Sequence, residues 1–500
     1  MKKRLLVMVM GLFQVMLSTM GYAAKDEIVV CQGGEVNSLD PMRHNSTSDT
    51  NYAIQVFDTL YFFDASGIPK PRLALSHKLI NDTTWEIKIR KGVKFHDGTV
   101  MTANDVKFSI DRMIDPVVKP LMAAFYSTLK DVTVVDGSTV RITTKAPDPL
   151  VLNRLSQSMY ILPAELFKKQ GAETFFQKPV GTGAFKFVSW NRNDRMILEA
   201  NANYWAGAPK IKRLIIRPVP EVAARVAELQ TGNADIIISV PPFLVPKLKE
   251  MPGVAVQSVL SGRAIFVYIN CSGQDALKNK KVRQALNYAI DRKSIIDNVL
   301  TGSGTPNAVG LTNYHFGFDP TLKPYPYDPA KAKKLLAEAG YPNGFKIEFN
   351  SPSGRYLMDK EIAEAMTKML NAVGVETELK VMEWGTLVQT YSQKRMKDLG
   401  FIGWGNMLYD ADGTVAPFYT AGSPFSYFSS SSLTEKVNQG RSTMDSKKRL
   451  AIYKQLQAEL FDEAPLIYLY QQIDNYGVSK ELKGFQARGD EWLTFWNVSK

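Results

Sequence analysis

The hydrophobic pattern changes partway along the chain, and this change restricts the fold more than any other feature. Residues 84–90 alternate strictly, with polar or charged side chains between the apolar positions Trp85, Ile87 and Ile89. A period of two is typical of a half-buried antiparallel strand. Residues 132–143 form two strand-like runs around Asp136-Gly137, which indicates a hairpin. We therefore predict a small sheet-rich α+β unit over about 63–180.

The second half of the chain has a different hydrophobic pattern, in which strands alternate with helices. Residues 214–239 read as strand, helix and strand, a unit expected to be parallel and right-handed. An amphipathic helix is predicted over 281–300. Asp328 and Pro329 should open a further helix that Gly340 ends. Helix 359–373 and strand 375–381 follow. These patterns predict an α/β fold with two lobes and a sheet-rich insert.

The chain starts with a secretory signal. Lys2, Lys3 and Arg4 precede an apolar stretch from Leu5 to Leu17, and small residues follow at 21–24. The apolar stretch is too short to span a membrane, so residues 1–24 are predicted to be a cleaved signal peptide. No cysteine stands at the exit, which argues against a lipid anchor there. The mature protein is expected in the periplasm, where no ATP or reduced nicotinamide is supplied.

Charge and motif content exclude several function classes. The formal net charge of +12 comes from Lys and Arg residues that are scattered along the chain. This pattern favours a solvated basic surface over a basic stripe that binds nucleic acid. The four histidines show no metal spacing, and no Walker loop or nucleophile elbow occurs. We expect no metal site, no cofactor and no catalytic residues. Cys31 and Cys271 permit one disulfide, with two buried free thiols as the alternative.

Several short sequence motifs, spaced over about 26–480, together resemble those of one protein family. They include Asn37 to Pro41, Ile89 to Gly98, Thr102 to Val106, Pro179 to Phe185, Asn203 to Trp205, Val282 to Leu286, Ala289 to Arg292, Tyr327 to Pro329 and Leu335 to Pro342. Their order resembles the peptide/nickel class (family 5) of solute-binding proteins that serve ABC importers. The region around 322–345 and 229–232 is most similar to the glutathione- and dipeptide-binding branch. Most of these motifs can also be explained as turns and helix packing faces.

The resemblance implies a periplasmic binding protein fold of type II. Lobe I would comprise 25–62, 181–269 and 480–500, with the insert 63–180 attached to it, and lobe II would comprise 270–479. Two strands would cross between the lobes near 268–272 and 476–481. Such proteins close on their ligand like a hinge, because contacts from both lobes favour the closed form. The resemblance also places both cysteines in lobe I or at its border, where the disulfide is expected.

Three segments are expected to line the cleft. The first is the polar loop 44–51, with Ser46, Thr47 and Ser48 before a helix that starts near Tyr52; capping of that helix is the alternative. The second is Arg355, which stands where relatives anchor a peptide carboxylate, or else is a solvated surface arginine. The third is 401–412, where the resemblance implies an aromatic wall at Trp404. The acidic residue that closely follows the tryptophan in dipeptide binders is missing here, because 406–408 are Asn, Met and Leu. Asn406, Asp410 and Asp412 are therefore the candidates for ligand contact in this segment.

The predicted function is capture of a small peptide-like solute, such as a di- or tripeptide or glutathione, for an inner-membrane ABC permease. A monomer without nucleic-acid partners is expected. Nickel, haem or another non-peptide solute is the alternative within the class. A sensory or chaperone-like binding protein is the next alternative. A secreted hydrolase is disfavoured, because no histidine lies in a catalytic phrase.

Overall fold

The computed structural model describes residues 26–43, 46–118, 120 and 123–500. The predicted signal peptide and part of the polar loop 44–51, its first two residues, lie outside the described residues. Within the described part of the chain, no helix is both long and apolar enough to cross a membrane.

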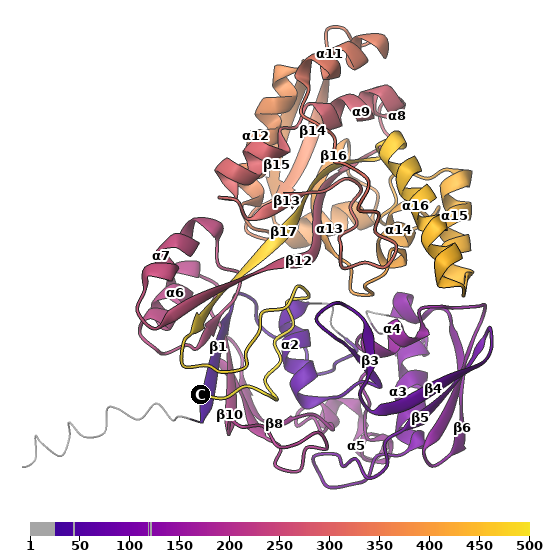
Figure 1. Ribbon diagram of the computed structural model, residues 1–500, viewed down its shortest axis with the longest axis vertical. Helices are drawn as coiled ribbons and strands as arrows, with labels where there is room; N and C mark the ends of the chain where they lie inside the picture. The colour runs from indigo at the N-terminus through magenta and orange to yellow at the C-terminus, as the bar shows by residue number, and fades with distance from the viewer. Residues whose placement is uncertain (1–25, 44–45, 119, 121–122) are drawn as a thin grey trace, which may run out of the picture.

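One eleven-stranded sheet runs through the whole molecule. Its strand order is β15-β14-β16-β12-β17-β11-β1-β10-β9-β8, and β13 pairs with β17 off this path. The long strands β12 (Val254–Ile269) and β17 (Leu466–Ser479) are antiparallel neighbours at its centre. They extend from the lower part of the molecule into the upper part (Figure 1). The two parts are therefore joined by this pair of strands, and we call them lobe I and lobe II.

Lobe I holds one end of the sheet. The predicted strand–helix–strand unit over 214–239 is confirmed, with both of its strands parallel to β1, which lies between them. The elements of this lobe are β1 (Glu27–Gln32), α2 (Thr47–Val56), β8 (Phe185–Asn191), β9 (Arg195–Ala200), β10 (Arg213–Pro218), α6 (Val222–Gln230), β11 (Ile236–Ile237) and α7 (Val245–Glu250).

The insert carries a separate four-stranded sheet in the order β4-β5-β7-β6. The alternation predicted for 84–90 is confirmed, because Trp85, Ile87 and Ile89 are all buried. The predicted hairpin is confirmed too, since Asp136 pairs with Thr139. The elements are β2 (Tyr61–Phe63), β3 (Pro69–Pro71), β4 (Ala74–Asn81), β5 (Thr84–Ile89), α3 (Ala103–Ile114), β6 (Leu129–Asp136), β7 (Thr139–Thr144), α4 (Val151–Ser156) and α5 (Ala164–Phe175).

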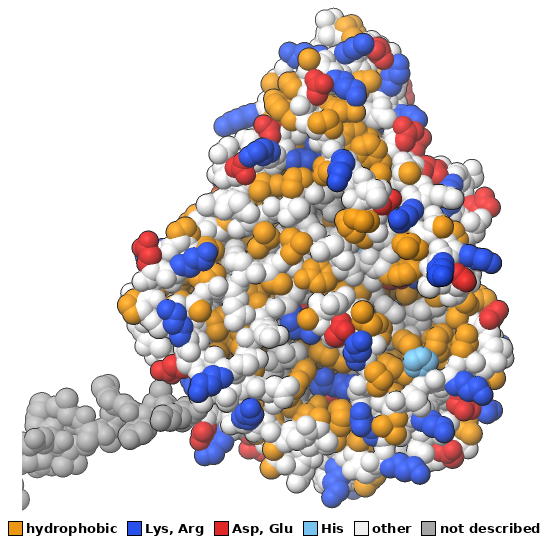
Figure 2. Space-filling model, viewed as in Figure 1, with side chains coloured by type: hydrophobic (Ala, Val, Ile, Leu, Met, Phe, Trp, Pro, Cys, Tyr) orange, Lys and Arg blue, Asp and Glu red, His pale blue; other side chains and the backbone are white. Residues whose placement is uncertain are grey.

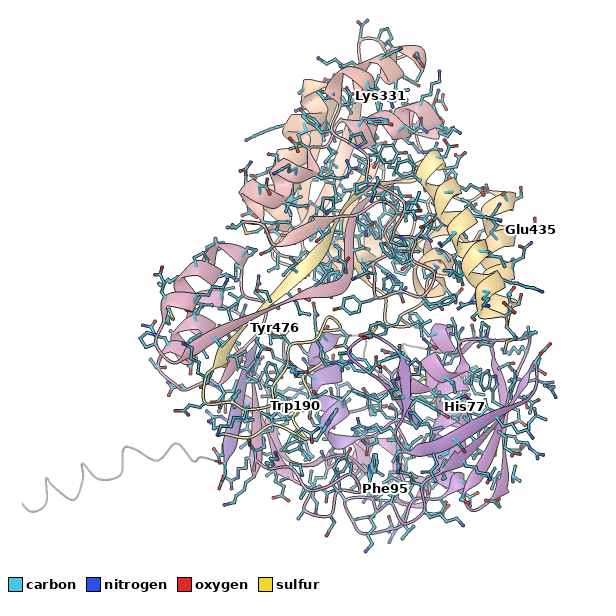
Figure 3. The ribbon with its side chains drawn as sticks, viewed as in Figure 1. His77, Phe95, Trp190, Lys331, Glu435 and Tyr476 are labelled. Atoms are coloured by element: carbon cyan, nitrogen blue, oxygen red, sulfur yellow. The ribbon has the colours of Figure 1, made fainter. Side chains whose placement is uncertain are left out.

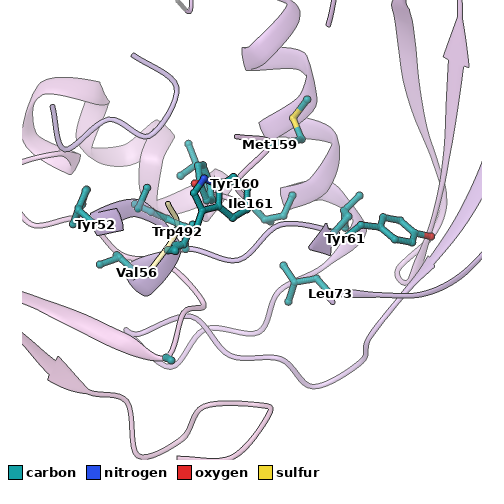
Figure 4. Close-up of a cluster of buried hydrophobic side chains, with 14 of the residues drawn as sticks. Tyr52, Val56, Tyr61, Leu73, Met159, Tyr160, Ile161 and Trp492 are labelled. Atoms are coloured by element: carbon teal, nitrogen blue, oxygen red, sulfur yellow. The ribbon is translucent and has the colours of Figure 1, made fainter. Parts of the chain in front are cut away.

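Lobe I and the insert share one hydrophobic core. Tyr52 and Val56 of α2 pack in the same cluster as Tyr160 and Ile161 of the insert and Trp492 of the C-terminal segment (Figure 4). That segment returns past α2 after β17 (Figure 1), where Leu493 N–H donates to the side chain of Asn51 at 2.9 Å. The shared core makes the insert and lobe I one unit that faces lobe II.

Lobe II is a three-layer α/β structure. Alternate residues of β12 face opposite sides of the sheet, so Ile265, Val267 and Ile269 enter one hydrophobic cluster and Phe266 and Tyr268 another. The elements are α8 (Asp275–Lys278), α9 (Lys280–Tyr288), α10 (Arg292–Ser294), β13 (Gly304–Pro306), α11 (Pro329–Glu338), β14 (Phe345–Pro352), α12 (Asp359–Ala372), β15 (Val375–Met382), α13 (Trp384–Ser392), β16 (Leu399–Gly405), α14 (Asp412–Tyr419), α15 (Ser431–Ser442) and α16 (Ser446–Glu463).

Two helix predictions for lobe II have different outcomes. The helix opened by Asp328 is confirmed as α11, whose N-cap carboxylate accepts from Lys331 N–H at 2.8 Å. The single helix predicted over 281–300 is wrong, because α9 ends at Tyr288 and a short α10 with one π-helical turn follows. Asp291 caps this second start by accepting from Ser294 N–H, and Arg292 beside it is buried and bonds Tyr468 C=O. These contacts fix the break in the helix.

The strands cross between the lobes earlier than expected. β12 pairs with β17 on both sides of an irregularity between Leu260 and Ala264, and beyond it β12 also pairs with β16 of lobe II. The crossing therefore lies near 261–263 and 471–473 rather than 268–272 and 476–481. Figure 3 shows Tyr476 on β17 beneath lobe II, which carries Lys331 and Glu435, and above His77, Phe95 and Trp190.

The expected disulfide between Cys31 and Cys271 is wrong. Both thiols are free. Cys31 packs among α6 and α7 of lobe I, whereas Cys271 follows β12 and packs on the core of lobe II. Burial raises the pKa of Cys31 to about 11 and that of Cys271 to about 12. Each cysteine therefore acts as a small apolar residue of its own lobe.

Candidate functional site

A cavity of about 120 Å³ lies where the two lobes and the C-terminal segment meet. Four stretches and two single residues line it: Ser46 and Thr47, Ser261 to Arg263, Arg355, Gly405 to Met407, Tyr409, and Gly489 to Trp492. The first and last of these belong to lobe I, and Arg355 and Gly405 to Tyr409 belong to lobe II. Ser261 to Arg263 stand at the strand crossing. The cavity is thus bounded by lobe I, lobe II and the strand crossing between them.

The N-terminus of α2 forms the wall on the lobe I side. Ser46 is the N-cap, and its side chain accepts from Asp49 N–H at 3.2 Å. The helix starts at Thr47, five residues before the position expected from sequence. Asp49 lies buried in the first turn, where it accepts N–H donors of Asn37 and Ser38 and so fixes this end of the helix. Ser46 and Thr47 therefore line the cavity while Ser48 lies against Gly34.

Opposite charges meet on two sides of the cavity. Arg263 lies 3.3 Å from the Glu491 carboxylate, which also accepts from Thr47 Oγ1 at 3.0 Å. Burial opposes ionisation of Glu491, but the positive charges of Arg263 and Arg355 outweigh it and lower its pKa. Glu491 is therefore a carboxylate in the physiological range and spans both lobes through Thr47 and Arg263.

Arg355 stands in the loop after β14 and adds a second positive charge. Its guanidinium lies 5.0 Å and 5.1 Å from the ring centres of Tyr356 and Trp384. The backbone of the loop is fixed by Asp359, which accepts from Arg355 N–H at 2.9 Å. Desolvation, followed by the charge of Arg263, lowers its pKa. Among the described residues, no carboxylate lies within ion-pair distance of its guanidinium.

Asp474 lies buried on β17 close to Glu491 and Arg263. Burial first, and then the negative charge of Glu491, raises its pKa to about 7. One of its oxygens accepts from Gln472 Nε2 at 2.5 Å, whereas the other has no hydrogen-bond partner within the described part of the chain. The carboxyl group is therefore close to the point of ionisation at neutral pH, beside the strand crossing.

A tight loop carries the lobe II wall. Asn406 is buried and uses its side chain within the loop, donating to Asp410 C=O at 2.6 Å and accepting from Leu408 N–H at 3.1 Å. Tyr409 adopts a left-handed backbone conformation with φ 53°, and Glu491 does so with φ 62°. Residues other than glycine rarely adopt this backbone conformation, and those held in it cluster at functional sites. Two such residues bound this one cavity.

The structure brings together four of the eight ligand-contact candidates. Ser46, Thr47, Arg355 and Asn406 line the cavity, whereas Ser48, Trp404, Asp410 and Asp412 do not. Trp404 donates to Gly413 C=O at 2.9 Å and packs against Phe418. Asp410 is paired with Arg449 at 2.6 Å, and Asp412 lies 3.0 Å from Arg441. Asp412 also lies 4.0 Å from Arg154 of the insert, so both carboxylates are held in ion pairs outside the cavity.

Arg263, Glu491 and Trp492 line the cavity although no sequence pattern predicted it, and Tyr409 lies in the expected segment 401–412 but was not singled out there. Arg263 belongs to a strand, and the C-terminal segment carries no recognisable phrase. Arg263 and Glu491 are 228 residues apart in sequence, and the tertiary fold brings them to within 3.3 Å. A usable indication was absent, except that Glu491 and Trp492 lie in an aromatic and acidic C-terminal stretch.

The arrangement suits a small ligand with both charges. Arg355 and Arg263 offer donors for a carboxylate, and Glu491 offers an acceptor for an ammonium group. Within the described residues, no group of three or more His, Cys, Asp or Glu side chains could hold a metal ion. Lys and Arg are interspersed with Asp and Glu on the face shown in Figure 2, where they form no basic stripe.

Comparison with known proteins gives consistent results. The curated relatives include the glutathione-binding protein GsiB of Pectobacterium atrosepticum, which is 32% identical over 97% of this chain and 96% of its own length. GsiB of Escherichia coli is 30% identical over the same shares.

Solved structures of binding proteins are similar to this chain as well. NikZ from Campylobacter jejuni in complex with Ni(L-His) is 27% identical, with a TM-score of 0.84 over 95% of this chain and 100% of NikZ. A dipeptide-binding protein of Pseudoalteromonas in complex with Met-Leu shares the fold at 23% identity, with a TM-score of 0.83 over 95% of this chain and 100% of that protein. The family model of the bacterial extracellular solute-binding proteins, family 5, matches residues 69–425. The chain therefore belongs to family 5 of the bacterial extracellular solute-binding proteins.

Proposed function

We propose that the protein captures a small peptide-like solute, a di- or tripeptide or glutathione, and delivers it to the permease of an ABC importer. The solute carboxylate would bind Arg355, with Arg263 beside it, and the ammonium group would bind Glu491. The observation that carries this proposal is Arg355, a guanidinium at a closed interlobe cavity without an ion-pair partner among the described residues.

The relatives support the same class of ligand. GsiB is named for glutathione, and the Pseudoalteromonas protein holds a dipeptide. Both ligands carry free carboxylate and ammonium groups. The proposal also includes export by the signal peptide to the periplasm, a monomeric state, no catalytic activity and no nucleic-acid partner. Inner-membrane permease subunits would be its protein partners.

A second candidate is a nickel complex of a small organic acid. NikZ, with its bound Ni(L-His), favours it as an alternative. Because the described residues offer no cluster for a bare metal ion, the chelator's carboxylate would have to be recognised instead. The two candidates then share Arg355 and differ only in whether nickel is required.

The test is calorimetric titration of ligand-free protein with glutathione, a set of dipeptides and nickel with histidine. We expect one peptide or glutathione to bind without nickel. Arg355→Ala should weaken that binding by roughly 2–5 kcal/mol, the cost of truncating one partner of a desolvated charge pair. Arg395→Ala is the matched control, since Arg395 is an exposed lobe II arginine away from the cavity, and it should bind like wild type.

Three outcomes would contradict the proposal. Binding that requires nickel would favour the chelate. Unchanged affinity in Arg355→Ala would remove this residue from the site. Absence of heat with every peptide and with glutathione would refute peptide capture.

A further inference from the structure

A second cavity of about 490 Å³ lies between the insert and lobe II. It is lined by Ser66 to Pro69, Pro149, Leu150 and Asn153 of the insert, and by Asn313 to Phe316, Tyr409, Asp410, Met444, Ser446 and Arg449 of lobe II. Tyr409 is the residue that lines both this cavity and the smaller interlobe cavity. Its ring therefore stands at the boundary between the two spaces.

The ring is held firmly in that position. Tyr409 is only 6% exposed, and its ring centre lies 4.7 Å from that of Phe63 in the insert and 6.4 Å from that of Tyr314 in lobe II. Gly67 provides room for it, because a Cβ atom at that position would lie 2.0 Å from the ring. The insert and lobe II thus grip the ring from both sides.

The backbone on either side of the ring is anchored as well. Leu408 C=O accepts from Asn153 Nδ2 of the insert at 2.8 Å, and Tyr409 C=O accepts from Phe316 N–H at 2.9 Å. The next residue, Asp410, forms its buried ion pair with Arg449. These contacts hold Tyr409 in the left-handed conformation, so the ring is a fixed wall rather than a mobile side chain.

We propose that Tyr409 is a specificity-determining residue that limits the length of the bound solute. This inference rests on the proposed capture of a peptide-like solute in the interlobe cavity. The ring closes that cavity toward the larger space between the insert and lobe II. A short solute ends at the ring, whereas one or two further residues would need the space behind it. Removing the ring would join the two cavities into one elongated site.

The test compares Tyr409→Gly with Tyr409→Phe. Glycine removes the ring and adopts φ 53° without strain, whereas phenylalanine keeps the wall and loses only the hydroxyl. Dialanine and glutathione, each also lengthened by one or two alanines at either end, are titrated calorimetrically into wild type and both variants. Thermal unfolding checks that each variant is folded, and Tyr409→Ala replaces the glycine variant if that one is not.

We expect wild type and Tyr409→Phe to bind a short parent compound and to reject its longer forms. Tyr409→Gly should bind at least one longer form roughly tenfold or more tightly than wild type does, the change that burial of one or two methyl-sized groups brings. Wild-type binding of the longer forms as tightly as the parent would overturn the inference. So would a folded glycine variant with unchanged length preference. If dialanine and glutathione do not bind, the dipeptide that binds wild type in the earlier titration serves as the parent compound; if no peptide of that set binds, the proposed function itself fails, which is a separate result.

Discussion

At the scale of single residues, Asp474 has the most unusual ionisation near the site. Its pKa rises from the ordinary aspartate value of 3.8 to about 7, because burial and the charge of Glu491 both disfavour its ionised form. A raised pKa in the folded state means that folding holds the proton more tightly than the unfolded chain does. This contribution to stability is complete below pH 4 and is lost as pH rises through 7.

Asp474→Asn should therefore stabilise the protein at high pH. The asparagine cannot ionise, so the variant avoids the penalty that wild type acquires between about pH 4 and pH 7. We expect a gain of up to roughly 4 kcal/mol at pH 8 that shrinks as pH falls. Urea unfolding of both proteins at a series of pH values measures it. Parallel stability curves over that range would show that Asp474 does not titrate as described.

At the scale of elements, the N-terminus of α2 depends on one buried carboxylate. Asp49 accepts from Asn37 N–H at 2.6 Å, from Ser38 N–H at 3.1 Å and from Asn37 Nδ2 at 3.0 Å. It thereby joins the segment after β1 to the helix that presents Ser46 and Thr47 to the cavity. The site on the lobe I side is thus positioned by a residue that does not line it.

Asp49→Ala should lower the free energy of unfolding by roughly 2 kcal/mol or more. The substitution removes the charged acceptor of the Asn37 and Ser38 N–H groups, and a hydrogen bond to a charged group contributes roughly 1.5–3 kcal/mol. Asp49→Asn keeps one acceptor oxygen and should lose less. Chemical unfolding of the three proteins checks the order. Equal stability of wild type and the alanine variant would mean that other acceptors replace the carboxylate.

At the scale of the whole molecule, the two lobes leave little space between them at the site. The interlobe cavity of about 120 Å³ is smaller than the roughly 300–1,000 Å³ of typical small-molecule sites. A solute that filled it would need the lobes to part before binding. The pairing of β12 with β17 is irregular between Leu260 and Ala264, where Gly262 N–H donates to Gly489 C=O, and we expect the strand pair to bend there.

We expect the free protein to be more open than the ligand-bound protein. A ligand that contacts both lobes shifts the equilibrium toward closure only by its higher affinity for the closed form. X-ray scattering should show a smaller radius of gyration at saturation. Tryptophan fluorescence should change as well, and Trp492→Phe assigns that change to the cavity wall. Identical scattering with and without ligand would count against hinge closure.

The local elements and the class of fold can be predicted from short-range patterns in the chain. Alternation over 84–90, the hairpin at Asp136 and the capped helix at Asp328 are local patterns, set by burial and by backbone hydrogen bonds within a few residues. Arg355, Ser46 and Thr47 were found because neighbouring residues in the chain identify their segments. The family followed from the order of many such segments.

Which side chains share the cavity depends on contacts between segments that lie far apart in the chain. Arg263 and Glu491 meet because β12 and the C-terminal segment pass each other at the strand crossing, and their sequence neighbours give no sign of it. Asp410 and Asp412 lie close to Asn406 in sequence, yet their carboxylates bind Arg449 and Arg441 of lobe II. Cys31 and Cys271 remain apart for a similar reason, since each is buried in the core of its own lobe. Burial of charge and packing over long sequence distances made these choices, and no local pattern records them.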